Sequence, residues 1–338
     1  MTATGVGVAI LGSGGIAREH AAALARLPGV EVRYVVGGDL ARSRGVAALA
    51  PGAVATTDLE RALADPAVQG VDVCGVTPLH APLTIRAARA GKHVHVEKPA
   101  ALSMAGLHEM IAEVRARRLT LMTGQTVRFQ PGVAALHRAV AAGEIGAVHL
   151  LRVGWYTGYV WAGGWRGWQL DPARSGGHPV HNGTHAFDLL VWLMRDRRPT
   201  RVFVRSFRTL SPDVPVPDSF HATVRFDDGS LALVELSYAL RERGASLRRV
   251  LAVGDRGTLR HEDDGDSGLH SEAARAPSAS VDGAIGAQMA HWAAVLRGET
   301  EPITTPRQMC LTLATALAAQ RSLVTGRAVD VPEAADVR

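Results

Sequence analysis

Residues 6 to 125 alternate short apolar runs with helix-forming segments, and this rhythm limits the fold more than any other feature of the chain. Apolar runs that predict strands lie at 6–11, 30–36, 71–76, 93–96 and 120–123, and segments that predict helices lie at 16–27, 41–50, 83–90 and 103–117. Strands that are apolar throughout, rather than at every second residue, are typical of strands covered on both faces. Because strand–helix–strand units cross over with one hand, the pattern predicts a parallel sheet with helices on both sides.

The rhythm changes beyond Pro131, where apolar residues recur at every second position. Residues 219–226 and 230–238 both alternate in this way and are joined by an Asp-Gly pair, which strongly indicates a β-hairpin. Further strands are predicted at 149–155, 201–207, 248–253 and 258–261, helices at 133–142, 284–297 and 307–323, and an exposed loop at 262–277. The second half is therefore expected to be an α+β domain with a large, open and mainly antiparallel sheet.

Length and composition agree with two globular domains. At 338 residues the chain exceeds the usual size of one domain, and the change of rhythm divides it into residues 1–125 and 126–338. Its 47% hydrophobic and 20% charged residues exclude a disordered protein. The net charge of +5 is small and no five basic residues follow one another, which argues against a nucleic-acid partner.

The apolar runs, the first residues and the two cysteines of the sequence indicate the cellular compartment of the protein. No apolar run has the length of a bilayer span, and the first residues lack the pattern of a secretion signal. Cys74 and Cys310 lie far apart in apolar surroundings, so we expect buried free thiols in a reducing compartment and no metal site at either. We therefore expect a cytoplasmic protein without a membrane partner.

A glycine-rich turn, Gly12 to Ala17, separates the first predicted strand from the first predicted helix and has the spacing G-x-G-x-x-A. In such a turn the first glycine permits a tight bend, the second lets a pyrophosphate approach the backbone, and the small last residue lets the helix pack closely. The phosphate is then held by the N–H groups at the start of the helix. We therefore expect a dinucleotide site that includes Gly12, Ser13, Gly14, Gly15 and Ile16.

The end of the second predicted strand bears on which dinucleotide binds. Enzymes that use NAD usually place an acidic residue there to hold the ribose 2′-hydroxyl, but this chain has Gly37, and Asp39 comes two residues later. Arg42 and Arg44 follow closely enough to meet a 2′-phosphate, although in so arginine-rich a chain both could belong to a solvated helix face. We favour NADP over NAD, and we include Gly37 and Arg42 in the expected cofactor site.

Lysine is rare in this chain, which has only Lys92 and Lys98 among 37 basic residues. Arginine stays charged at any accessible pH, whereas lysine can give and take a proton. Lys98 lies in a Glu-Lys-Pro motif directly after a predicted strand, at the edge where open α/β sheets bind their ligands. Lys92 follows Gly91 in a predicted turn, where any solvated cation would serve, and we expect no role for it.

Four motifs together resemble the glucose–fructose oxidoreductase, inositol dehydrogenase and MocA (GFO/IDH/MocA) family. They are Glu97-Lys98-Pro99, Val76-Thr77-Pro78, the segment 124–131 and the histidine-rich segment 175–188. The resemblance covers nearly the whole chain and implies a Rossmann domain joined to an α+β domain, whose open sheet often mediates assembly into a homo-oligomer such as a dimer or tetramer. It also implies a nicotinamide-dependent enzyme that interconverts a secondary alcohol and a ketone on a sugar, glycoside or cyclitol.

The same resemblance assigns roles to individual residues. Lys98 matches the lysine beside the substrate hydroxyl and the nicotinamide, and His185 matches the catalytic histidine, whose ordinary pKa suits a general base. His181 precedes His185 by four residues, so on one helix the two would share a face and could relay a proton, with Asp188 orienting His185. The further cofactor residues are Thr77, Pro78, His80, Glu97, Lys98 and Gln125, and the substrate residues are Lys98, Arg128, Trp165, Arg166, Asp171, His181 and His185.

Two departures from the family pattern concern the substrate. The family commonly has an aspartate where this chain has His181, and the loop after Thr77-Pro78 lacks a frequent asparagine, which brings His80 nearer the cofactor. The stretch 155–168 holds four of the six tryptophans and is either part of a sugar pocket or an anchor for a loop or a subunit interface.

Three alternative interpretations follow from the same residues. His178, His181 and His185 could bind a metal, but Pro179 places His178 before the helix and no cysteine or acidic cluster completes a tetrahedral site, so we expect no metal. Some relatives are redox-neutral: they oxidise a sugar transiently, eliminate a glycosidic group and return the hydride. A cofactor-sensing regulatory protein on the same fold would show a damaged Glu-Lys-Pro motif or lack the histidine, and this chain shows neither sign.

Overall fold

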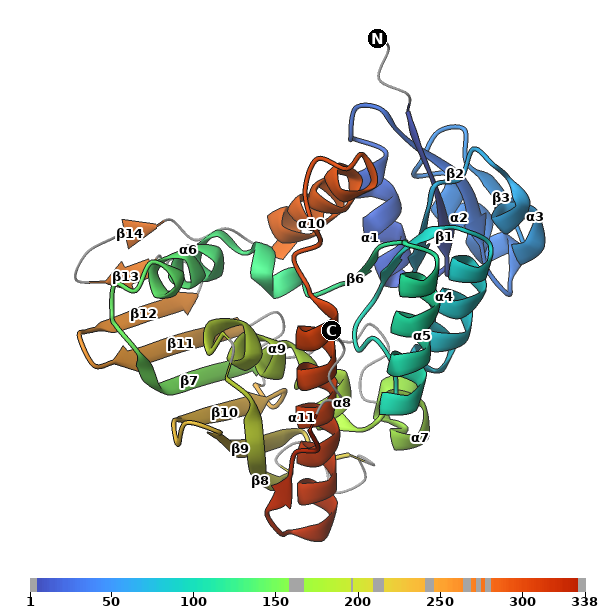
Figure 1. Ribbon diagram of the computed structural model, residues 1–338. Helices are drawn as coiled ribbons and strands as arrows, with labels where there is room; N and C mark the ends of the chain where they lie inside the picture. Colours follow the sequence, from blue (N-terminus) through green and yellow to red (C-terminus); the bar gives the residue numbers. More distant parts are fainter. Residues whose placement is uncertain are drawn as a thin grey trace. The chain divides into compact units, whose positions relative to one another are not determined.

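The computed structural model describes residues 5–157, 167–195, 197–208, 216–240, 246–263, 269–271, 275–276 and 281–333. The chain divides into two compact units (Figure 1). The first comprises Met1–Thr126 with Asp282–Pro306, and the second comprises Val127–Val281 with Arg307–Arg338. Within the described residues, no helix has both the length and the apolar character needed to span a membrane.

The first unit is built on a six-stranded parallel sheet with the strand order β3-β2-β1-β4-β5-β6. Its strands are β1 (Val6–Leu11), β2 (Val30–Val36), β3 (Val54–Thr56), β4 (Gly70–Val73), β5 (His93–Val96) and β6 (Leu121–Thr123). Every residue of β1 is buried, as its uninterrupted apolar run predicts for a central strand. The order reverses between β1 and β4, and ligands of such sheets bind outside the carboxyl ends of the strands at this reversal.

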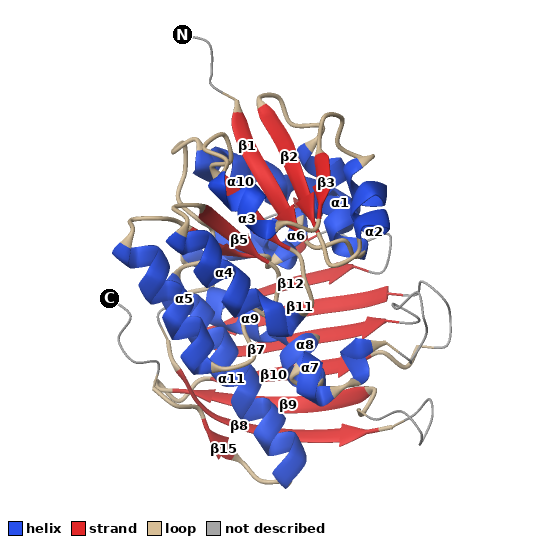
Figure 2. Ribbon diagram, turned by 90° about the vertical axis from the view of Figure 1, so that its right-hand side faces the viewer, coloured by secondary structure: helices blue, strands red, loops and turns tan. Residues whose placement is uncertain are grey.

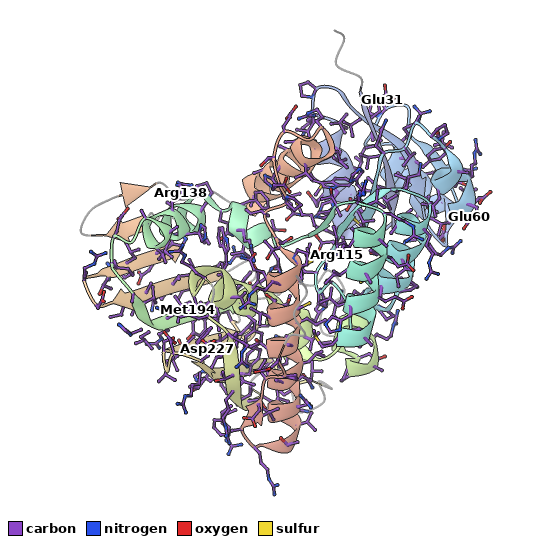
Figure 3. The ribbon with its side chains drawn as sticks, in the orientation of Figure 1. Glu31, Glu60, Arg115, Arg138, Met194 and Asp227 are labelled. Atoms are coloured by element: carbon purple, nitrogen blue, oxygen red, sulfur yellow. The ribbon has the colours of Figure 1, made fainter. Side chains whose placement is uncertain are left out.

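Helices connect the strands of this sheet, so the predicted Rossmann architecture is confirmed (Figure 2). They are α1 (Gly15–Leu24), α2 (Leu40–Ala47), α3 (Leu59–Ala64), the 3₁₀ turn η1 (Thr77–Leu79), α4 (His80–Arg89) and α5 (Met104–Ala116). Three of these helices are capped at the N-terminus by the residue before them, Asp39 for α2, Asp58 for α3 and Ser103 for α5. Each side chain accepts a backbone N–H of the first turn. Charged side chains such as Glu31 and Glu60 project from the outside of the unit (Figure 3).

Another helix of this unit, α10 (Val281–Leu296), comes from far along the chain. A Cβ atom added to Gly70 of β4 would lie 2.7 Å from Leu296 Cδ1, so the glycine lets α10 approach the sheet. The expected second domain, 126–338, included this segment, whereas Asp282–Pro306 packs with the first unit. An apolar helical pattern predicts a buried face, but it does not predict which of two sheets covers that face.

The second unit contains a nine-stranded sheet with the order β14-β13-β12-β11-β7-β10-β9-β8-β15. Its strands are β7 (Val148–Thr157), β8 (Pro199–Phe207), β9 (Ser219–Phe226), β10 (Leu231–Ser237), β11 (Ser246–Gly254), β12 (Thr258–Asp263), β13 (Leu269–Ser271), β14 (Arg275–Ala276) and β15 (Val329–Asp330). Only β7 and β10 pair in parallel among these described strands, so the predicted, mainly antiparallel sheet is confirmed. The exposed loop predicted at 262–277 is wrong for the described part, which holds the end of β12 and the strands β13 and β14.

Helices cover one face of this sheet (Figure 2). They are α6 (Pro131–Ala141), α7 (Pro172–Ser175), α8 (His178–His181), α9 (Thr184–Leu193) and α11 (Pro306–Thr325), with the 3₁₀ turns η2 (Thr126–Phe129) and η3 (Trp168–Leu170). Along β9 the buried Phe220 and Val224 alternate with the exposed His221 and Arg225. The period of two in the sequence therefore separates the face packed against helices from the opposite face.

Candidate functional site

The glycine-rich turn of the first unit leaves the start of α1 open. Gly12 has a φ of 145°, and an added Cβ would lie 2.6 Å from the carbonyl oxygen of Cys74, so only glycine fits. Gly14 precedes α1, no side chain caps this helix, and a Cβ added to Gly14 would meet no atom within 4 Å. The N–H groups of the first turn are thus available to an anion, which fits the pyrophosphate of a dinucleotide.

The end of β2 has no room for the acidic side chain of a typical NAD site. A Cβ added to Gly37 would lie 2.6 Å from Ser43 Oγ and 2.8 Å from Ser13 Oγ. The Asp39 carboxylate is committed elsewhere, because it accepts the Arg42 N–H at 3.1 Å and caps α2. The side chains of Arg42 and Arg44 are exposed.

Beyond β4, the turn η1 presents an unsatisfied polar atom. Thr77 is buried, and its Oγ1 has no hydrogen-bond partner among the described residues. A buried hydroxyl without a partner is costly, and a bound ligand at this edge of the sheet would supply one. Thr77 and Pro78 thus lie where the cofactor was expected, after the central strand β4.

His80, the first residue of α4, is tied to the backbone on both sides of its ring. Nδ1 lies 2.7 Å from the carbonyl oxygen of Pro99 and Nε2 lies 3.0 Å from that of Gly75. Burial lowers the pKa of His80, although both carbonyl contacts oppose that effect. The residue therefore links the loop after β4 to the segment that carries Lys98, and its ring is buried.

Lys98 follows β5 together with Glu97, as the sequence predicts for the carboxyl edge of the sheet. Burial lowers the pKa of the Lys98 amine, and the Glu97 carboxylate partly opposes this. The Lys98 backbone N–H donates to Glu97 Oε2 at 3.2 Å. Gly124, after β6, makes space for the same carboxylate, since a Cβ there would collide with Glu97 Oε1. Gln125, the next residue, is buried.

The other lysine, Lys92, lies in a different setting from the one expected. Its side chain is 7% exposed, and Nζ donates to the carbonyl oxygens of Asp65 and Val68, each at 2.8 Å. Burial lowers the pKa of this amine as well. The expectation of a solvated cation at Lys92 is therefore wrong, because its side chain reaches two carbonyl oxygens of the segment between α3 and β4.

The two candidate catalytic histidines of the second unit, His181 and His185, lie on two short helices rather than one. Asn182 and Gly183 form a turn between α8 and α9, so the shared helical face expected for His181 and His185 is wrong. The two rings contact different aromatic side chains. His181 meets Trp168 edge-on with 5.1 Å between centroids, and His185 stacks on Trp155 with 5.4 Å between centroids.

Trp155 carries a second partner on its ring. The Arg248 guanidinium carbon lies 4.3 Å from the ring centroid, and the two residues face each other across the paired strands β7 and β11. A guanidinium over an indole is a favourable cation–π contact. Trp155 of β7 thus joins His185 to the sheet, and its ring also contacts Arg248 of β11.

His178 begins α8 and is buried, whereas the sequence placed it before the helix. Burial lowers its pKa to about 4, so its ring is neutral at physiological pH. A neutral ring donates its Nδ1 proton to the Pro217 carbonyl oxygen at 2.8 Å, and it packs on Phe220 and Tyr238. These contacts favour a structural role for His178.

Arg128 is also buried, with 1% of the residue exposed. Its guanidinium donates to Asp188 and to Gln308, and it lies over the Trp192 ring at 4.9 Å. The carboxylate that was expected to orient His185 is therefore paired with Arg128. These contacts place Arg128 in the core beside α9. They engage its guanidinium with protein groups, whereas the sequence predicted a contact with the substrate.

The remaining expected substrate residues divide into two groups. Asp171 is exposed and caps α7 by accepting the Ala173 N–H at 3.0 Å. Trp165 and Arg166 lie outside the described residues.

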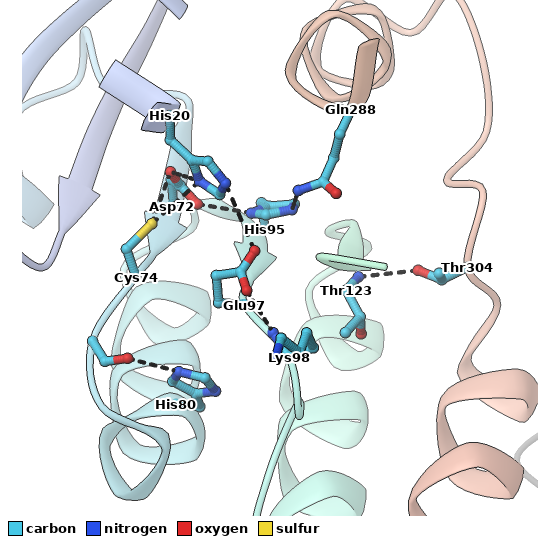
Figure 4. A network of polar contacts seen from close by, with 11 residues as sticks. His20, Asp72, Cys74, His80, His95, Glu97, Lys98, Thr123, Gln288 and Thr304 are labelled. Atoms are coloured by element: carbon cyan, nitrogen blue, oxygen red, sulfur yellow. Dashed lines mark hydrogen bonds and ion pairs between the residues drawn. The ribbon is translucent and has the colours of Figure 1, made fainter. Parts of the chain in front are cut away.

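A buried polar network in the first unit was missed at the level of sequence. Asp72 of β4 accepts hydrogen bonds from His20 Nδ1 of α1 at 2.9 Å and from His95 Nδ1 of β5 at 2.7 Å (Figure 4). The nitrogen and oxygen atoms of these three side chains lie within 4.8 Å of one another. The available signal was the presence of Asp72 and His95 within apolar strands, where a charged residue needs a buried partner.

Two family models match the chain. Residues 6–125 match the model described as an oxidoreductase family with an NAD-binding Rossmann fold, and residues 133–260 match the GFO/IDH/MocA C-terminal domain. The chain belongs to the GFO/IDH/MocA oxidoreductase family. The resemblance read from the Glu-Lys-Pro and histidine motifs is thereby confirmed.

Full-length relatives of this GFO/IDH/MocA oxidoreductase include sugar enzymes. The 1,5-anhydro-D-fructose reductase of Ensifer adhaerens is 26% identical over 335 residues, which cover 95% of this chain and 97% of that protein. The D-apiose dehydrogenase of Paraburkholderia graminis is 27% identical over 347 residues, with 96% and 89% covered. The solved structure of GenD2 from gentamicin A biosynthesis, in complex with NAD, is 27% identical, covers 97% of each chain and has a TM-score of 0.82.

Proposed function

We propose that this protein interconverts a secondary alcohol and a ketone on a sugar, glycoside or cyclitol with a nicotinamide cofactor. The observation that carries the proposal is the position of Lys98 directly after β5, where burial lowers the pKa of its amine. The same sheet has an open glycine-rich turn after β1 that fits a pyrophosphate. The names of two full-length relatives, a reductase of 1,5-anhydro-D-fructose and a dehydrogenase of D-apiose, support the substrate class.

The proton chemistry is assigned to Lys98, His185 and His181. The nicotinamide, when bound, accepts or supplies the hydride. For the alcohol to lose a hydride its hydroxyl proton must leave too, and Lys98 can take that proton or stabilise the developing alkoxide. His185 acts as the general base, and His181 relays protons. The two histidines belong to different helices, so the proposed relay does not depend on a common helical face.

NADP is the proposed cofactor, with NAD as the alternative. Three observations support this choice: Gly37 leaves no space for an acidic side chain, Asp39 is occupied in capping α2, and Arg42 is exposed in the first turn of α2. A 2′-phosphate would be attracted by Arg42 and by the neighbouring Arg44. The residues proposed to hold the cofactor are Gly12, Ser13, Gly14, Gly15, Ile16, Gly37, Arg42, Thr77, Pro78, His80, Glu97, Lys98 and Gln125.

Substrate contacts are proposed for the second unit as well. His181 and His185 lie beside Trp168 and Trp155, whose faces can pack on the C–H groups of a sugar ring. Trp165, Arg166 and Asp171 remain proposed contacts. Arg128 is proposed to serve the substrate through α9, since its ion pair with Asp188 fixes the helix that carries His185.

The open face of the second unit's sheet supports a homo-oligomer. Leu231 of β10 is 41% exposed and Phe207 of β8 is 46% exposed, and both strands belong to that sheet. We propose a dimer or tetramer formed through this face, which light scattering after gel filtration would test. We also propose a cytoplasmic location, because the chain carries free thiols at Cys74 and Cys310.

A substrate panel tests the proposed function. Sugars, cyclitols and glycosides are each offered with NADP⁺ and with NAD⁺, and both the nicotinamide absorbance and the products are followed. We expect absorbance to rise with at least one sugar or cyclitol and with NADP⁺ preferred. Release of an aglycone without net change in absorbance would indicate redox-neutral cleavage instead. Cofactor binding without turnover across the panel would favour a regulatory protein.

A further inference from the structure

A line of buried titratable groups runs through the first unit behind Lys98. His20 on α1, Asp72 on β4 and His95 on β5 are fully buried, and Glu97 is 7% exposed (Figure 4). Burying a charge is expensive unless an opposite charge or hydrogen bonds compensate it. The arrangement of these side chains therefore constrains which of them carry charge.

The hydrogen bonds of Asp72 assign the protons on one side of the network. The carboxylate faces Nδ1 of His20 and Nδ1 of His95, so each of these two Nδ1 atoms carries a proton and donates it to Asp72. Cys74 donates its S–H to the same carboxylate at 3.2 Å. Gln288 of α10 lies 3.1 Å from His95 Nε2, where its amide N–H can donate to the ring's lone pair. Both nitrogens of the His95 ring therefore have a hydrogen-bond partner.

His20 is in a different position, because a second carboxylate faces its other nitrogen. Nε2 of His20 lies 3.7 Å from Oε1 of Glu97, and neither atom has a hydrogen-bond partner among the described residues. A lone pair on Nε2 would repel the carboxylate, whereas a proton there attracts it. The two carboxylates of Asp72 and Glu97 therefore flank one imidazole that can carry a positive charge.

Electrostatics points in the same direction. Burial alone would lower the pKa of His20, but Asp72 and Glu97 outweigh it and raise that pKa. Burial would also raise the pKa of Asp72, yet His20 and His95 hold it well below its usual range. One cation between two anions makes the burial of both carboxylates tolerable.

We propose that His20 is a buried imidazolium that holds the Glu97 carboxylate beside Lys98 and so acts as a positioning residue for the chemistry of that lysine. This inference rests on the proposed function. Glu97 joins the two, since its Oε1 faces His20 and its Oε2 accepts the Lys98 backbone N–H. The imidazolium also offsets the negative charge of Glu97, which would otherwise favour the protonated amine of Lys98.

The sign of the effect follows from the surrounding charges. The titratable and charged groups that face this line are Glu19 and His20 of α1, Asp72 and Cys74 at β4, His80 of α4, and His95, Glu97 and Lys98 at β5. Removing the His20 cation leaves Glu97 uncompensated, so the pKa of the Lys98 amine rises. A reaction that needs neutral Lys98 then requires a higher pH.

Two variants of the full-length protein test the proposal. His20→Asn keeps an N–H at the reach of Nδ1 for Asp72 but loses the charge and the Nε2 proton, and His20→Gln places its amide toward Glu97. His93→Asn is the control, because His93 also lies on β5 but bonds to Thr120 outside the network. For both His20 variants we expect the rising limb of kcat/KM to move about 0.5–1 pH unit upward, with cofactor affinity within about twofold. The His93 variant should keep the wild-type limb.

A direct measurement keeps the inference separate from the proposed function. The ¹⁵N shifts of the His20 ring, assigned by comparison with His20→Asn, report its protonation without any turnover. Two protonated nitrogens at pH 7 support the inference even for a protein with no redox activity. A neutral ring overturns it, and so does a limb of kcat/KM that stays in place in the His20 variants. A stoichiometric metal ion in the purified protein, lost in Asp72→Asn, would also overturn it, because the imidazoles would then be ligands.

Discussion

Arg128 donates two parallel hydrogen bonds to Asp188, from Nε to Oδ2 at 2.7 Å and from Nη2 to Oδ1 at 2.8 Å. The pair is buried and joins η2 to α9, the helix of His185. Bidentate geometry of this kind fixes orientation as well as distance. The position of the proposed catalytic histidine in the second unit thus depends on an ion pair between Asp188 of its own helix and Arg128, which lies far from it in sequence.

Removing Arg128 should lower the free energy of unfolding far more than breaking an ion pair on the surface does. Arg128→Met leaves the Asp188 carboxylate buried without its cation, and we expect a loss of about 3–5 kcal/mol in urea unfolding. The control Arg152→Ala breaks an ion pair with Glu235 whose arginine is about half exposed, and it should cost about 1 kcal/mol or less. Arg128→Met combined with Asp188→Leu should recover most of the loss. Equal effects of the two single variants would contradict the importance of the buried pair.

The two lysines should respond differently to the same substitution. Lys98→Met removes the amine proposed to take the hydroxyl proton or to stabilise the alkoxide, so kcat should fall roughly 10²- to 10⁴-fold while cofactor affinity stays near normal. Lys92→Met removes two hydrogen bonds to carbonyl oxygens and should cost roughly 1–3 kcal/mol of stability without changing kcat. Stopped-flow kinetics and urea unfolding of both variants provide the comparison. Wild-type turnover in Lys98→Met would exclude the proposed mechanism.

Cofactor choice should depend on the two arginines of α2. Neutralising Arg42 and Arg44 together should raise the Kd for NADPH about tenfold or more, since each can pair with the 2′-phosphate. The Kd for NADH should change by no more than about twofold. Arg89→Ala, which breaks a surface pair with Glu113, is the matched control. An unchanged Kd for NADPH, measured by fluorescence titration, would favour NAD as the natural cofactor.

Acid should destabilise the second unit through His178. Its pKa is about 4 in the fold and near 6.5 when unfolded, so the unfolded chain binds more protons between these values. Stability from this group is therefore complete above pH 6.5 and falls as the pH drops toward 4, by roughly 3 kcal/mol. His178→Asn keeps a donor for the Pro217 carbonyl oxygen and should show a smaller decline in urea unfolding across that range. An identical decline in both proteins would place the acid sensitivity elsewhere.

Local patterns predicted the first unit well. The apolar run of β1 and the glycines after it are neighbours in sequence, so their spacing alone specified a strand, a turn and a helix. Gly37 follows the same logic, because the sequence alone shows that the acidic residue typical of an NAD site is missing there. The hairpin of β9 and β10 was predicted for the same reason, from the Asp-Gly pair between two alternating runs.

Contacts between distant segments were not predictable in this way. Arg128 and Asp188 are separated by 60 residues, and only the fold shows that they meet. The segment of α10 packs against Gly70 of the first sheet, although its sequence pattern would fit either sheet. The break between α8 and α9 did leave a local signal, since Asn182-Gly183 is a common turn dipeptide.

The engagement of Lys92 by two carbonyl oxygens has a practical consequence for labelling. An amine-selective acylating reagent needs a neutral and accessible nitrogen, and the Lys92 nitrogen belongs to a buried residue and donates to two carbonyl oxygens. Lys98 is partly exposed, and its lowered pKa increases the neutral fraction at mildly alkaline pH. Acylation should therefore fall on Lys98 in preference to Lys92. The extent of modification, read by mass spectrometry at a series of pH values, would then report the titration of a single side chain in the intact protein.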